Sequence, residues 1–221
     1  TSTLQQEASN KFNYSPKQTM DNAQKLYEAG LITYMRTDSV ALSKDALESI
    51  KEYITKSYGE DYYSYCEYKN KTSNTQEAHE AIRPCDINKS NIDYLEDMSI
   101  YCKRLYALIW KRTIASQMAP ACISIYTTKI SMSNSEYLFI GKQEVIQFDG
   151  FLRVYKPYKE EEEEDENDSK GSNSLILFNK GEILTHNIIK SEERYTKSPI
   201  RRFTEASLIK DLTEKGIGRP S

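Results

Sequence analysis

The hydrophobic pattern changes its period at Pro120, and this change constrains the fold more than any other feature of the sequence. Before Pro120, apolar residues recur every three to four positions, as on one face of a helix. After it they alternate, as at Ile123 and Ile125, which is typical of a strand with one buried face. The sequence therefore predicts an α+β fold in which helices precede an antiparallel sheet.

Capping signals locate the helices. Ser15 followed by Pro16 and Gln18 is a capping-box start, and Gly30 stops that helix. A Ser or Thr at the same kind of position begins two further helices. We expect helices over residues 3–11, 16–29, 44–58, 97–118 and 205–215, with irregular segments over 31–42 and 60–89.

Turn residues divide the expected sheet, which covers residues 121–190. Asp149-Gly150 is a two-residue hairpin signal, and Asn179-Lys180-Gly181 predicts a second turn. The strands expected beside these turns are 143–148 with 151–155 and 175–178 with 183–189.

Charge is unevenly distributed along the chain. Residues 159–170 contain eight acidic residues and two lysines, and we expect them to form a solvated, disordered loop. The net charge of the whole chain is −3, so the remainder carries +3 and a polyanionic partner stays possible. No apolar stretch approaches the ~20 residues of a membrane span, so we expect no membrane partner.

The cysteine spacing argues against a metal site. The four cysteines are separated by 19, 17 and 20 positions, and no pair forms a zinc knuckle. No Asp-x-Asp motif or Gly-rich phosphate loop is present. We therefore expect no metal ligands in this chain. It starts without Met, and we expect it to be a piece of a longer protein.

The segment 33–39 is the first candidate for chemistry. If it is extended, Tyr34, Arg36 and Asp38 share one face. A tyrosine oxygen can attack phosphorus, an arginine can grip phosphate oxygens, and a carboxylate can orient the arginine. A phenol with an ordinary pKa of about 10 needs activation for this role. From spacing alone, a surface ladder of these residues is the more common alternative.

Two other features are weaker. His79 could bind phosphate or move a proton, although an isolated histidine is more often an ordinary surface residue. Residues 196–221 carry a net charge of +3, which suits either a nucleic-acid backbone or an ordinary solvated helix. The spacing does not decide between these alternatives.

Several motifs in a fixed order resemble the central part of a type IA DNA topoisomerase, specifically the bacterial topoisomerase I branch. Tyr34-Met-Arg-Thr-Asp-Ser39 and the downstream Glu77-Ala-His-Glu-Ala-Ile-Arg-Pro84 are the most specific. The resemblance rests on residues 1–8, 23–39, 76–84, 104–110, 115–120, 148–150 and 203–221, so it spans nearly the whole chain.

The resemblance implies roles for the matched positions. Tyr34 would be the nucleophile that becomes linked to a 5′ phosphate, Arg36 would hold the scissile phosphate, and His79 would assist there. Other matched residues would contact DNA or lie near its path: Gln24, Glu28, Thr33, Thr37, Asp38, Arg202 and Thr204.

The resemblance also implies a domain organisation. Residues 1–118 would form a helical catalytic gate domain with a helix-turn-helix-like core. Residues 119–195 would be part of a β-rich arch domain containing the acidic loop, and residues 196–221 would begin the DNA-binding base domain. The Toprim domain, which supplies acidic magnesium ligands in this family, and the rest of the base domain would be missing from the chain.

The implied activity is the relaxation of negatively supercoiled DNA in the cytoplasm. One strand is cleaved through a 5′-phosphotyrosine, another strand passes, and the break reseals without ATP. The full-length enzyme would use Mg²⁺ and bind single-stranded or negatively supercoiled DNA, and we expect the isolated chain to be inactive.

Three alternatives remain. A non-catalytic single-stranded nucleic-acid-binding module would use Tyr34 as a stacking residue. A tyrosine recombinase would place its nucleophile after its Arg and His motifs, whereas here Tyr34 precedes His79. A purely structural domain is opposed by the matched pair of motifs.

Overall fold

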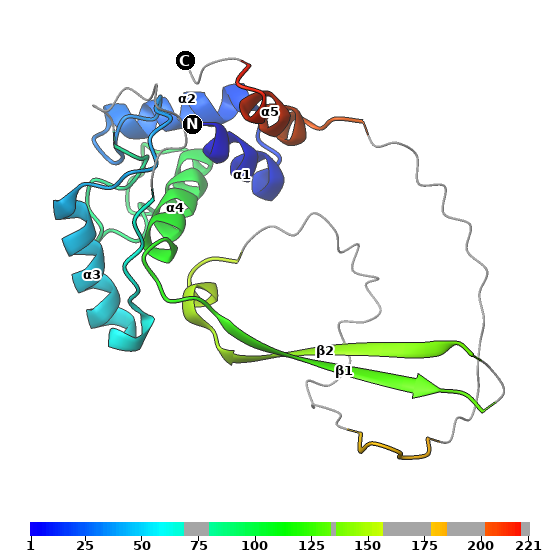
Figure 1. The fold of residues 1–221 in the computed structure, drawn as a ribbon. Coiled ribbons are helices and arrows are strands. Elements are labelled where there is room, and N and C mark those ends of the chain that lie inside the picture. Colours follow the sequence, from blue (N-terminus) through cyan, green and yellow to red (C-terminus); the bar gives the residue numbers. More distant parts are fainter. Residues whose placement is uncertain (69–79, 134–135, 157–177, 185–201, 218–221) are drawn as a thin grey trace. The chain divides into compact units, whose positions relative to one another are not determined.

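The computed structural model describes residues 1–68, 80–133, 136–156, 178–184 and 202–217 (Figure 1). It divides into a helical unit, residues 1–121, 149–158 and 203–221, and a second unit, residues 122–148 and 159–202. The predicted α+β class is confirmed. The elements are α1 (Ser2–Phe12), α2 (Pro16–Glu28), α3 (Lys44–Tyr58), η1 (Glu60–Tyr62), α4 (Ile100–Ala115), β1 (Cys122–Ser131), β2 (Leu138–Phe148), η2 (Gly150–Arg153) and α5 (Glu205–Glu214).

The helices begin where the capping residues predict. The Ser15 hydroxyl accepts a hydrogen bond from the Gln18 amide at 3.2 Å, and Pro16 occupies the first turn of α2. The Ser43 hydroxyl caps α3 in the same way. Gly30 follows the end of α2 with φ +68°, a left-handed conformation that glycine adopts without steric cost. Gly30 therefore ends α2 and determines where the following segment, residues 31–42, begins.

Helix α4 is the central helix of the helical unit, and it contacts both α1 and α2 (Figure 1). It was predicted to start at Asp97 but starts at Ile100, because the Ser99 hydroxyl accepts a hydrogen bond from the Cys102 amide at 3.2 Å. Instead of one apolar stripe, α4 buries side chains on most of its circumference, as expected of a core helix. Its buried residues are Cys102, Leu105, Tyr106, Leu108, Ile109, Trp110, Thr113 and Ile114.

Helix α3, which follows the Tyr34 segment in the sequence, packs into the same core. Ile50 and Ile54 are fully buried in the cluster that includes α4. The rings of Tyr53 and Trp110 meet edge to face with centroids 5.4 Å apart. The chain between α2 and α3 is therefore tied at both ends to one packed core.

Strands β1 and β2 form an antiparallel hairpin, with Cys122 paired to Phe148 at one end and Ser131 to Leu138 at the other. No side chain of either strand is buried. Ile125, for example, is 61% exposed despite the alternating pattern that predicted a buried face. In the described part of the second unit, the two strands therefore pair with each other but bury no side chains in a hydrophobic core.

The hairpin predicted at Asp149-Gly150 is wrong. Residues 150–153 form η2, and β2 pairs with β1 instead of with residues 151–155. Gly150 has φ +48°, and a Cβ atom there would lie 2.4 Å from the Ala119 carbonyl oxygen. The Phe151 amide also donates to that oxygen at 2.9 Å. Residues 150 and 151 therefore pack against the chain that follows α4 and do not form the expected hairpin turn.

Helix α5 packs against α1 within the helical unit. Its N-terminus has the predicted cap, because the Thr204 hydroxyl accepts from the Ser207 amide at 3.1 Å and the Ser207 hydroxyl accepts from the Thr204 amide. The turn at residues 179–181 is also confirmed. The acidic run and most of the strands expected after residue 174 lie outside the described residues, and the assignment of gate, arch and base domains stays a prediction.

Candidate active site

The segment 31–42 connects α2 to α3, and its side chains alternate between two faces. Met35, Thr37 and Ser39 are buried, with exposed fractions of 0%, 3% and 8%. Tyr34, Arg36 and Asp38 are exposed. This alternation of exposure is the one expected of an extended segment, although the backbone bends at Met35 and Arg36. The phenol, the guanidinium and the carboxylate are all on exposed residues.

Hydrogen bonds hold the buried face in place. The Thr1 hydroxyl, at the start of α1, donates to the Met35 carbonyl at 2.5 Å and accepts from the Thr37 amide at 3.0 Å. The Thr37 hydroxyl accepts from the Ser39 amide, and the Ser39 hydroxyl accepts from the Ala41 amide. These main-chain groups of the segment thus bond to short polar side chains and not to a neighbouring strand.

Tyr34 lies beside the last turns of α2. Its ring meets the ring of Tyr27 edge to face, with centroids 5.3 Å apart. Gln24 lies three positions before Tyr27 and Glu28 one position after it, and the Gln24 side-chain amide donates to the Glu28 carboxylate at 2.7 Å across one turn of the helix. The structure therefore brings Tyr27 next to the candidate nucleophile, whereas Gln24 and Glu28 bond each other on the same part of α2.

The segment 80–85 runs alongside residues 31–33. The Thr33 amide donates to the Arg83 carbonyl, and the Cys85 amide donates to the Leu31 carbonyl. Ile32 and Pro84 form an isolated antiparallel bridge. The Thr33 hydroxyl donates to the Ala81 carbonyl at 2.8 Å and accepts from the Arg83 amide at 2.9 Å. Three hydrogen bonds, two of them at its hydroxyl, thus fix the residue before Tyr34 to residues 81 and 83.

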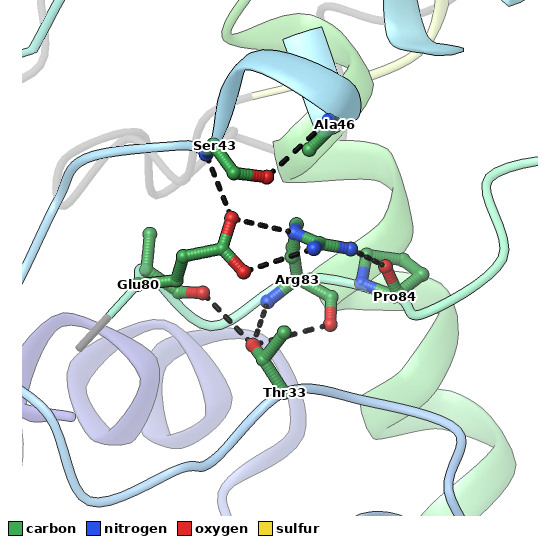
Figure 2. Close-up of polar contacts among 7 residues, drawn as sticks. Thr33, Ser43, Ala46, Glu80, Arg83 and Pro84 are labelled. Carbon is green, nitrogen blue, oxygen red and sulfur yellow. Dashed lines mark hydrogen bonds and ion pairs between the residues drawn. The ribbon is translucent and has the colours of Figure 1, made fainter. Parts of the chain in front are cut away.

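A partly buried ion pair completes this contact (Figure 2). The Arg83 guanidinium donates to both carboxylate oxygens of Glu80, at 2.9 and 3.3 Å. The same carboxylate accepts from the Ser43 amide at 2.7 Å. Partial burial alone raises the pKa of Glu80, but the hydrogen bonds from Arg83 and Ser43 outweigh it and leave the pKa below its usual value. Glu80 is therefore an anion at neutral pH.

Helix α4 supports the segment that follows. The Tyr106 hydroxyl donates to the Lys89 carbonyl at 2.7 Å, and burial raises the pKa of that phenol to about 12. The Trp110 indole donates to the Ile87 carbonyl at 2.8 Å. Residues 80–89 are therefore held between the core helix on one side and the Tyr34 segment on the other.

The remaining candidate residues are placed differently. Thr37 points to the buried face, and Thr204 caps α5. Arg202 is exposed but belongs to the second unit. His79 lies outside the described residues. The roles in catalysis or DNA binding named in the sequence analysis stay predictions for all of these residues.

Sequence reasoning missed Glu80 and Arg83. The opposite charges of Glu80 and Arg83, three positions apart, were the available signal. That spacing usually means a weak surface pair, so it did not single them out.

No group of three His, Cys, Asp or Glu side chains in the described part of the chain could hold a metal ion. Among the same residues, no helix combines the length and the apolar character needed to cross a membrane. The described groups around Tyr34 are a phenol, a cation and hydrogen-bonding side chains.

Comparison with known proteins gives a consistent result. A family profile described as DNA topoisomerase matches residues 1–221. The chain is 45% identical to the "DNA topoisomerase 1 type prokaryotic" of Acanthamoeba polyphaga mimivirus and 44% identical to DNA topoisomerase 1 of Vibrio cholerae serotype O1. Each match covers all of this chain but only 26% and 24% of the relative, so the chain spans about a quarter of their length.

The fold leads to the same family. The full-length topoisomerase I of Thermotoga maritima, in its monoclinic crystal form, matches with a TM-score of 0.80 and 36% identity. That match covers all of this chain and 35% of the Thermotoga chain. Together with the profile match over every residue, this similarity shows that the chain belongs to the bacterial type IA DNA topoisomerase family.

Proposed function

We propose that residues 1–221 form the part of a type IA DNA topoisomerase that carries the nucleophile, Tyr34. The chain would work within a longer polypeptide, since it corresponds to about a quarter of its curated relatives. Its substrate would be single-stranded or negatively supercoiled DNA in the cytoplasm. Cleavage of one strand, passage of another and resealing would relax the DNA without ATP.

One observation carries this proposal. The segment 33–39 exposes Tyr34, Arg36 and Asp38 and buries Met35 and Thr37 between them. A phenol and a guanidinium two positions apart on one strand face can reach the same phosphate group. The hydrogen bonds of the buried face keep this arrangement fixed before any substrate arrives, which favours a reacting geometry.

The proposed step is a reversible transfer of a phosphoryl ester. The Tyr34 oxygen forms a bond to phosphorus as the bond between phosphorus and the 3′ oxygen of the preceding nucleotide breaks. The phenol proton leaves, and the 3′ oxygen takes up a proton to become a hydroxyl. Resealing reverses each of these changes, and because one ester replaces another, no external energy source is needed.

Arg36 would bind the non-bridging oxygens of the scissile phosphate. Its guanidinium is planar and permanently charged, so it can donate two parallel hydrogen bonds and stabilise the charge that grows during attack. Asp38, next on the same face, would orient Arg36. His79 would assist at the same phosphate, and the face of α2 with Gln24 and Glu28 would border the DNA path together with Thr33, Thr37, Arg202 and Thr204.

The isolated chain would not cleave DNA. The family resemblance implies Mg²⁺ bound by acidic residues of a Toprim domain, and the described residues hold no comparable acidic cluster. A proton donor for the 3′ oxygen would also come from outside residues 1–221. When bound, the Mg²⁺ would help to position the phosphates.

A covalent trapping experiment tests the proposal. The full-length polypeptide is mixed with a single-stranded oligonucleotide labelled at one end, with Mg²⁺, and quenched in denaturant. Label should appear on the protein only when the 3′ end carries it, because Tyr34 retains the downstream fragment. Tyr34→Phe should abolish the adduct and leave binding intact, since the substitution removes the attacking oxygen and keeps the ring.

Tyr27→Phe is the matched control, because Tyr27 is similarly exposed and contacts the same ring. It should leave adduct formation unchanged. If the unsubstituted enzyme binds the oligonucleotide but never forms an adduct, Tyr34 is a contact residue and the non-catalytic binding module is the better description.

A further inference from the structure

The ion pair between Glu80 and Arg83 has a close counterpart a few residues away. Asp86 and Lys89 have the same spacing and opposite charges, but their side chains are 46% and 49% exposed and their atoms are 3.6 Å apart. The side chains of Glu80 and Arg83 are 30% and 16% exposed, and their contact is forked. A surface pair such as Asp86–Lys89 adds little stability, whereas a forked pair with low exposure fixes geometry.

The Glu80–Arg83 pair also joins two different elements. Through its carboxylate, Glu80 holds the Ser43 amide at the start of α3. Through its main chain, Arg83 holds both the amide and the hydroxyl of Thr33, directly before Tyr34. The segment 31–42 is therefore anchored near its beginning and at its end by the same two residues (Figure 2).

Each of the three guanidinium nitrogens makes one hydrogen bond inside this contact. Two of its nitrogen atoms bond Glu80, and the third donates to the Pro84 carbonyl at 3.0 Å. Pro84 is fully buried and bridges to Ile32. With its donors directed inward and its side chain 16% exposed, Arg83 is placed to hold the segment and not to grip a phosphate.

We propose that Glu80 and Arg83 are positioning residues that set where Tyr34 and Arg36 stand in the cleavage step. This inference rests on the proposed function. Neither side chain touches the exposed face of the segment in the contacts described above, so both would act through Thr33 and Ser43. A displacement of about 1 Å at a reacting group can cost roughly 100-fold in rate, so loosening either anchor should slow the chemistry.

The experiment measures the single-turnover rate of adduct formation at saturating oligonucleotide, in the full-length enzyme. Glu80→Gln and Arg83→Ala should each lower this rate by about 10- to 100-fold. The dissociation constant for the oligonucleotide, measured in the Tyr34→Phe background, should stay within about twofold. Arg83→Lys should recover part of the rate, because an ammonium still pairs with Glu80 but cannot fork.

Asp86→Asn is the matched control and should leave the rate unchanged. Circular dichroism at the assay temperature gives the folded fraction of each variant. A loss of rate no larger than the loss of folded protein would overturn the inference, as would a wild-type rate in a fully folded Glu80→Gln. If the unsubstituted enzyme forms no adduct, the proposed function fails and the inference fails with it.

Discussion

The segment 31–42 and the β1–β2 hairpin differ in two properties: how regular their backbone pairing is, and how many of their side chains are buried in a core. The hairpin has backbone pairing from Cys122 to Ser131, with one register shift between Cys122 and Ile123, yet none of its side chains is buried. The segment has one isolated bridge, at Ile32, and alternate side chains in the core. An irregular stretch can thus be held more firmly than a regular one, because buried side chains and their hydrogen bonds fix it.

This difference suits the proposed roles of the two regions. A nucleophile needs a fixed position relative to the phosphate, and the three contacts at Thr1, Thr33 and Ser43 supply it. A hairpin with both faces exposed suits a connection, since it adds length without a large core of its own. Three substitutions test this comparison: one in the segment 31–42, one at a residue that anchors it, and one in the hairpin.

The largest effect on stability should come from Met35→Ala. Met35 is fully buried between two exposed candidate residues, so truncation leaves a cavity and should lower the free energy of unfolding by about 2–5 kcal/mol. The adjacent change Arg36→Ala, on the exposed face, should alter it by no more than about 0.5 kcal/mol. Urea unfolding of both variants makes the measurement. Similar losses for the two would show that the two faces are not distinct.

The sequence predicted well those features that depend on neighbours in the chain. The caps at Ser15 and Ser43 and the alternation around Tyr34 each depend on residues a few positions apart. These interactions form wherever the local sequence allows, so a single sequence contains the necessary information.

Features set by distant contacts were missed. Glu80 meets Ser43 across 37 positions, and Arg83 meets Thr33 across 50. The Gly150 error has the same origin, because that residue lies against the carbonyl of Ala119 and not in a tight turn. No local pattern distinguishes a glycine needed for close approach from one needed for a hairpin.

A smaller effect should appear in the pH dependence of stability. The pKa of Glu80 is lowered in the folded chain, so its contribution is present above the unfolded pKa of about 4.3 and lost as pH falls through the folded value. Glu80→Gln should therefore lower the free energy of unfolding at pH 7 by about 1.5–3 kcal/mol, the range for hydrogen bonds to a charged group. The difference from the unsubstituted chain should shrink below about pH 4.

Urea titrations of both proteins at pH 7 and at pH 3.5 provide this measurement, with Asp86→Asn as the control. Asp86 belongs to the exposed pair, so its variant should follow the unsubstituted chain at both pH values. A difference between Glu80→Gln and the unsubstituted chain that persists at low pH would mean that the amide disturbs packing, and that the charge is not what anchors the segment.

The smallest effect should come from the hairpin. Ile140 on β2 is 59% exposed, so Ile140→Thr removes little buried apolar surface and keeps a β-branched side chain suited to a strand. The free energy of unfolding should change by less than about 0.5 kcal/mol, against the several expected at Met35. A loss above about 1 kcal/mol would show that another part of the second unit covers this strand. The regular region would then be anchored as the irregular one is, and the contrast between them would not hold.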